Sequence, residues 1–168
     1  RTVLAAFRVR DMKLVGKWDQ GENYHIDRVR WVNDDRFIMY VTRKTGAFDY
    51  RVGSADLYLS DVDGDDRIHI PNGATYGIVD VTWDDPETIL VQRSVDSAFL
   101  FKLNVYTGKL TTVATAPLRF GQFVLDREGQ VRYAIGQKDE GGDILTLRRD
   151  GEKWTTVHSA PMGESVRH

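Results

Sequence analysis

The sequence predicts an all-β protein that forms part of a β-propeller, with about three four-stranded antiparallel blades and half of an upstream blade. Three observations predict this class. Short runs alternate apolar and polar residues, turn signals separate these runs, and the order of runs repeats at a period in the low forties. The runs are too short and too regular in their alternation to indicate helices.

The period is measured between the glycines at equivalent turns and between the prolines that end each unit. Glycines at predicted hairpin turns lie 44 and 43 positions apart, at Gly64, Gly108 and Gly151. Prolines that follow the last strand of each unit lie 46 and 44 positions apart, at Pro71, Pro117 and Pro161. Because proline cannot donate to a central ladder, each one marks the exit from a unit.

The whole chain, 1–168, is therefore predicted to be a single propeller fragment. Its predicted segments are 1–27 (the end of an upstream blade), 28–72, 78–117 and 119–161. The first strands of the three blades are expected to start at Val29, Val79 and Gln122. Trp31 and Trp83 occupy the same place in two blades, so both are expected in the core between neighbouring blades. Natural rings use four to eight blades, so we expect this chain to belong to a longer protein.

Composition excludes several classes of function. The formal net charge is −2, so the sequence predicts neither a nucleic-acid partner nor an anionic membrane partner. The chain has no cysteine, which excludes disulfides, thiol nucleophiles and cysteine-ligated metals. A cysteine-free chain is compatible with the cytoplasm and with the periplasm, so both compartments stay open. No cofactor motif is found.

No catalytic residue is predicted. The nearest match to a nucleophile elbow, around Ser165, lacks the second glycine and a following helix. The segment 136–141 has two glycines like a phosphate loop but joins two predicted strands. The acidic run 61–66 has its glycine in the wrong place for a calcium loop and is interpreted as a hairpin turn. The four histidines show no metal-ligand spacing; they are His25, His69, His158 and His168.

One loop breaks the repeat. The connection between the second and third strands is short in the later blades but runs from Arg43 to Ser54 in the first. Long loops with aromatic and basic residues on the rim of a scaffold often carry recognition. We predict that it contacts a partner domain or subunit through Arg43, Phe48, Tyr50 and Arg51. The alternative is a tolerated surface insertion.

Two segments carry a family resemblance. Residues 26–36 (IDRVRWVNDDR) and 55–64 (ADLYLSDVDG) resemble the propeller of the prolyl oligopeptidase family of serine peptidases. The resemblance is greatest to its bacterial dipeptidyl-aminopeptidase and acylaminoacyl-peptidase branch. It implies that an N-terminal propeller caps a C-terminal α/β-hydrolase domain, whose catalytic serine, aspartate and histidine would lie beyond His168. It also implies that the propeller admits peptide substrates and keeps folded proteins out.

Two further hypotheses come from other classes. One is a propeller that serves as a binding scaffold with no associated enzyme, similar to the periplasmic TolB-type or WD-repeat proteins. The other is a non-propeller all-β domain. Under the propeller hypotheses, an array with open blade faces is expected to self-associate through them.

Overall fold

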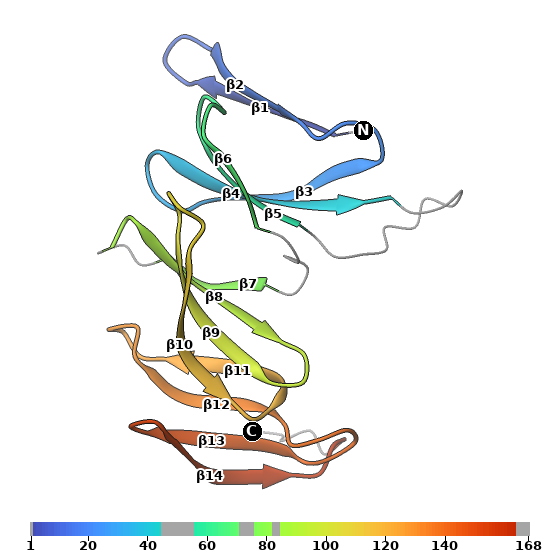
Figure 1. Ribbon diagram of the computed structural model, residues 1–168, viewed down its shortest axis with the longest axis vertical. Helices are drawn as coiled ribbons and strands as arrows, with labels where there is room; N and C mark the ends of the chain where they lie inside the picture. Colours follow the sequence, from blue (N-terminus) through green and yellow to red (C-terminus); the bar gives the residue numbers. More distant parts are fainter. Residues whose placement is uncertain (1, 45–55, 71–75, 82–84, 164–168) are drawn as a thin grey trace. The chain divides into compact units, whose positions relative to one another are not determined.

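The described part of the protein consists of antiparallel β-sheets. The computed structural model describes residues 2–44, 56–70, 76–81 and 85–163. These residues form one two-stranded sheet and three four-stranded sheets, and no segment of them is helical (Figure 1). The predicted class, a partial propeller of about three four-stranded blades and half of another, is confirmed. Within these residues there is also no helix of the length and hydropathy needed to cross a membrane.

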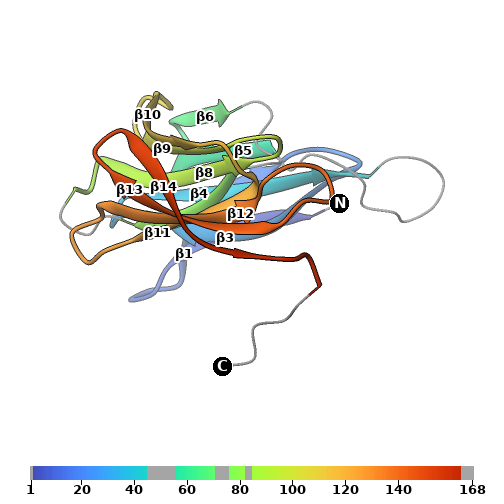
Figure 2. The same ribbon diagram turned by 90° about the horizontal axis from the view of Figure 1, so that it is seen from below.

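Each sheet uses strands that are consecutive in the sequence. The two-stranded sheet pairs β1 with β2, and the others have the orders β3-β4-β5-β6, β10-β9-β8-β7 and β11-β12-β13-β14. This is the up-and-down pattern that short hairpin connections impose on antiparallel strands. Figure 2 shows the last of these hairpins, β13–β14, in red. The strands are β1 Val3–Arg8, β2 Lys13–Asp19, β3 Tyr24–Trp31, β4 Arg36–Arg43, β5 Asp56–Asp61, β6 Arg67–Ile70, β7 Tyr76–Val81, β8 Thr88–Ser94, β9 Ala98–Asn104, β10 Leu110–Ala116, β11 Arg119–Leu125, β12 Val131–Gln137, β13 Ile144–Asp150 and β14 Lys153–Ala160.

The acidic run between β5 and β6 is a hairpin turn, as predicted. The Asp61 carboxylate accepts hydrogen bonds from the backbone N–H of Gly64 at 3.0 Å and of Asp66 at 3.1 Å. Gly64 has a φ of +85°, which a residue with a side chain rarely adopts. The described residues contain no group of three or more metal-ligating side chains placed to hold an ion.

The β3–β4 turn is held by Asn33. Its side-chain oxygen accepts hydrogen bonds from the backbone N–H groups of Asp35 at 2.9 Å and Arg36 at 2.7 Å. Its side-chain nitrogen donates to the Pro86 carbonyl at 2.6 Å and to the Tyr106 hydroxyl at 3.2 Å. An asparagine that caps its own turn and binds two further segments is a structural residue. The NDD part of the family-like block therefore stabilises the fold.

The chain divides into two compact units, each with its own core. The first contains Arg1–Thr75, Trp83–Ile89 and Leu103–Lys109, and the second contains Tyr76–Thr82, Leu90–Lys102 and Leu110–His168. In the first unit the core is formed by buried residues of β2 and β4, namely Trp18, Phe37, Met39 and Val41. In the second it is formed by buried residues of β8 to β13 and of the β10–β11 connection, namely Leu90, Ala98, Leu100, Ala114, Ala116, Leu118, Phe123, Val131, Ala134 and Leu147.

Acid is expected to weaken the β11–β12 turn through Asp126. Its carboxylate accepts the backbone N–H of Gln130 at 2.8 Å and binds the Arg132 guanidinium at 2.6 Å, and these contacts lower the pKa of Asp126. A carboxyl whose pKa is lower in the folded chain stabilises the fold above its unfolded pKa, and the contribution is lost as pH falls through the folded value. We expect NMR titration to give Asp126 a pKa below that of Asp126 in the urea-unfolded chain; equal values would contradict this.

Candidate functional site

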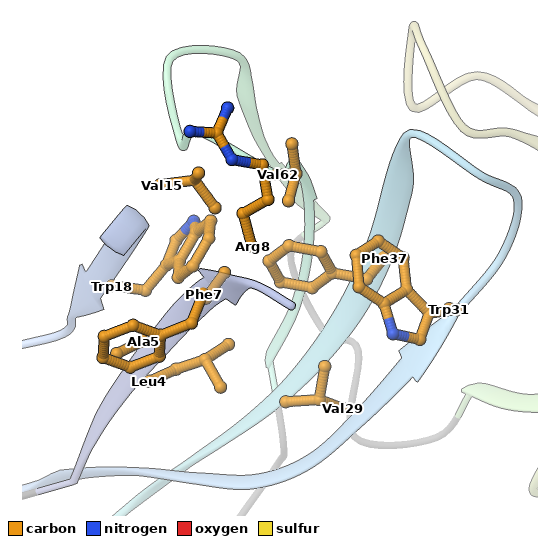
Figure 3. Close-up of a pocket in the computed structure, with 11 residues that line it drawn as sticks. Leu4, Ala5, Phe7, Arg8, Val15, Trp18, Val29, Trp31, Phe37 and Val62 are labelled. Carbon is orange, nitrogen blue, oxygen red and sulfur yellow. The ribbon is translucent and has the colours of Figure 1, made fainter. Parts of the chain in front are cut away.

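A hollow in the first unit lies between the β1–β2 hairpin and the sheet β3–β6. It has a volume of about 450 Å³. Figure 3 shows its side chains, which come from both sheets. They are Leu4, Ala5, Ala6, Phe7, Arg8, Val15, Trp18, Val29, Trp31, Phe37 and Val62.

Trp18 forms the floor of the hollow and joins the two sheets. Its side chain is 0% exposed, and its indole N–H donates to the Ser60 hydroxyl on β5 at 2.8 Å. Its ring meets the Phe37 ring edge-on at a centroid distance of 4.8 Å. Gly16, two residues earlier on the same strand, makes room for this ring, since a Cβ there would collide with the Val62 carbonyl and the indole. The site is therefore built on a buried contact between β2 and β5.

Trp31 is not a core residue, so the prediction for it is wrong. The side chain is 55% exposed at the end of β3, where it packs edge-on against Phe37 at 5.5 Å and lines the hollow. Trp31 ends the first strand of its sheet, whose last five side chains are all exposed. Among the described residues of this unit the buried tryptophan is Trp18, which the repeat does not single out. Trp83 lies outside the described residues.

The positive charge of Arg8, which lines the hollow, is paired with a carboxylate. The Arg8 guanidinium donates two hydrogen bonds to the Asp11 carboxylate, from Nε at 2.9 Å and from Nη2 at 2.7 Å. This pairing raises the pKa of Arg8 and lowers the pKa of Asp11, so both groups are charged at neutral pH. The pair is exposed, and its contribution is screened by water and salt.

The chemistry available in the hollow is that of binding. Its aromatic and aliphatic side chains can contact an apolar group, and the edges and faces of Trp31 and Phe7 are exposed to receive one. A guanidinium that is paired with a carboxylate keeps its proton at neutral pH and does not act as a general base. The lining residues of the described chain thus favour recognition over catalysis at this place.

The structure places one of the four predicted contact residues. Arg43 is the last residue of β4, where it is exposed and lies over the Tyr24 ring at 5.8 Å from its centroid. Phe48, Tyr50 and Arg51 lie outside the described residues, so their role in partner contact stays a prediction. Arg43 lies on a different part of the sheet from the hollow. In the described chain, Phe37 is the only β4 residue that lines the hollow.

The histidines in the described residues lie apart from one another. His69, on the outermost strand β6, stacks on the Tyr58 ring at 4.6 Å, and its Nε2 is 3.5 Å from the Asp56 carboxylate. Burial, with a smaller effect of Asp56, raises the pKa of Tyr58, so the phenol is protonated at neutral pH. His25 lies 3.0 Å from the Thr2 hydroxyl through Nδ1, and His158 is exposed on β14. Both His69 and His158 lie on the outermost strands of their sheets and are exposed.

Two segments were compared with known motifs: 136–141 with a phosphate loop, and the region around Ser165 with a nucleophile elbow. The glycine-containing segment 136–141 belongs to the hairpin between β12 and β13, closed by a backbone hydrogen bond from Lys138 N–H to Asp143 O at 3.0 Å. This confirms that it joins two strands, whereas a phosphate loop joins a strand to a helix. Ser165 lies outside the described residues.

Comparison with known proteins adds no relative. No family model, no curated protein and no solved structure matches the chain.

Proposed function

We propose that this chain is the noncatalytic propeller portion of a prolyl-oligopeptidase-type serine peptidase, where it limits the access of peptides to an α/β-hydrolase domain. One observation carries the proposal. The two segments that resemble the family propeller lie in one sheet, where Arg36 at the end of the first pairs with Asp61 of the second and binds Asp66, just beyond it, at 2.6 Å. Two family-like segments that also contact each other resemble the family propeller more specifically than either segment does alone.

The sheet geometry suits a wall that restricts passage. Each four-stranded sheet has its strands in sequential order, and the cores of both units hold sheet faces together. Such sheets are stiff, because their backbone groups are paired and their side chains are closely packed. A stiff wall can exclude folded proteins by size while extended peptides pass.

The partners of this function would be the hydrolase domain of the same parent chain and a peptide substrate. The loop that contains Phe48, Tyr50 and Arg51, together with Arg43, is our proposed contact with a partner domain or subunit. The apolar hollow beside Trp31 is not required for the proposal. The described chain supplies binding surfaces, and the proposed peptide hydrolysis would occur on a serine of the hydrolase domain.

The test is to label the product of the complete reading frame with a fluorophosphonate, which reacts with activated serines. We expect one serine in a Gly-x-Ser-x-Gly segment to be labelled, and the same product to cleave short chromogenic peptides but not a folded protein. The control is the Ser→Ala variant at that position, which should show neither reaction. A complete product with no such segment and no labelling would contradict the peptidase and favour a binding scaffold.

A further inference from the structure

Phe120, the second residue of β11, has an unusual backbone conformation for its residue type. Its φ is +50°, in the left-handed region, and its side chain is 62% exposed. Bulky residues rarely adopt this conformation, since the Cβ approaches the backbone, and they persist there only where their surroundings impose it. Strained residues of this kind occur disproportionately at sites that bind something. An exposed aromatic ring gains little for the fold from such a position.

The backbone around Phe120 is fixed by its neighbours. Its N–H donates to the Val95 carbonyl at 3.1 Å, and the β11–β12 register shifts between Arg119 and Gln122. A Cβ on Gly136 would lie 2.6 Å from the Gly121 Cα, so the two strands approach where neither has a side chain. A local irregularity of this kind changes the direction in which a side chain points. Here it turns the Phe120 ring outward.

Arg119 connects the ring to two carboxylates. The centre of its guanidinium lies 5.5 Å from the centroid of the Phe120 ring. Its nitrogens lie 3.4 Å from the Asp96 carboxylate, in the β8–β9 connection, and 3.5 Å from the Glu140 carboxylate, in the β12–β13 connection. Arg119 is mostly buried, whereas Asp96 is 83% and Glu140 is 93% exposed. One positive charge is thus set against two carboxylates that face water.

We propose that Phe120, Asp96 and Glu140 bind the side chain of an arginine or lysine in an extended peptide. The exposed part of an aromatic ring attracts a cation through its quadrupole, and the two carboxylates give the place an excess of negative charge. A guanidinium or ammonium group can contact the ring and a carboxylate at the same time. Its test is binding by this chain alone, so the outcome does not depend on whether the proposed peptidase function holds.

Binding is tested on the whole 168-residue chain with end-blocked pentapeptides that have arginine, lysine or citrulline at the centre. Citrulline has the shape of arginine without the charge, and blocked ends remove the terminal amine as a competing cation. We expect the arginine and lysine peptides to move the amide resonances of Phe120 and Gly121, with a dissociation constant on the order of 1 mM or tighter. The citrulline peptide should bind at least tenfold more weakly. Equal binding of citrulline and arginine peptides, or no binding by either, would overturn the proposal.

The variant Phe120→Asn separates a binding role from a structural one. Asparagine tolerates a positive φ, so we expect the melting temperature to stay unchanged or rise by about 2–4 °C, while arginine-peptide binding weakens tenfold or more. The control Val124→Asn replaces another exposed apolar residue of β11 and should leave binding unchanged. The double variant Asp96→Asn with Glu140→Gln, on exposed connections, should weaken binding severalfold. A lower melting temperature with binding retained in Phe120→Asn would make the ring structural and refute the site.

Discussion

Replacing Trp18 with alanine should lower the free energy of unfolding by about 3–5 kcal/mol, the usual loss for a large buried aromatic side chain. The indole is fully buried, contacts Phe37 and donates to Ser60 on the facing sheet. Its removal leaves a cavity between β1–β2 and β3–β6. The loss is measured by urea denaturation followed by far-ultraviolet circular dichroism.

Two comparison variants show whether burial is the cause. Trp31→Ala removes the same side chain from an exposed place in the same unit, so we expect a change within about 1 kcal/mol. Trp18→Phe keeps most of the apolar surface but removes the N–H that Ser60 accepts, and should cost about 1–2 kcal/mol. If Trp31→Ala were as harmful as Trp18→Ala, the contact between the two sheets would be centred elsewhere.

Removing the Asp66 carboxylate should destabilise the chain by about 3 kcal/mol, because it leaves a buried guanidinium without its counterion. Arg36 is 2% exposed, binds Asp66 at 2.6 Å and lies over the Tyr106 ring at 5.0 Å. Asp66 is 55% exposed, so some water reaches the pair, and the expected loss is at the low end for a buried ion pair. The variant is Asp66→Ala, measured by the same denaturation.

Removing the Arg36 charge together with the Asp66 carboxylate tests whether the unpaired charge causes the loss of stability. The double variant Arg36→Met with Asp66→Ala should recover most of the stability that Asp66→Ala loses, since methionine fills the space without a buried charge. As a control, Asp150→Ala breaks the exposed Arg148–Asp150 pair and should leave the denaturation midpoint within experimental error. A double variant less stable than Asp66→Ala would show that the Arg36 contacts with Tyr106 outweigh the charge.

The turns of this fold could be predicted from the sequence, but the starts of some strands could not. Hairpin turns need residues such as Asp61 and Gly64, and these mark their own positions. By contrast, the strands β3, β7 and β11 begin at Tyr24, Tyr76 and Arg119, each before the predicted start at Val29, Val79 or Gln122. The extra residues of β3 include Tyr24 and Ile26, which pack against the core, but the register with β4 shifts between Ile26 and Arg28 and interrupts the alternation along the strand.

The site residues were harder to predict for a related reason. Trp31 recurs in register with Trp83, but recurrence gives the place in the repeat and not which side of the strand is covered. The spacing of Gly16 and Trp18 on one face of β2 was the available signal for the buried tryptophan. The outward ring of Phe120 depends on the close approach of Gly121 and Gly136, and this becomes visible only when β11 and β12 are paired.

The sequential order of strands in every sheet also bears on how the chain folds. Pairing neighbours such as β11 with β12 closes short loops, and short loops cost little chain entropy. Folding rates fall as contacting residues become more distant in the sequence, so each four-stranded sheet has a low kinetic barrier for its size. The contact of Trp18 with Ser60 spans 42 positions and joins two sheets. We therefore expect the docking of sheets through such contacts to be slower than the formation of the hairpins.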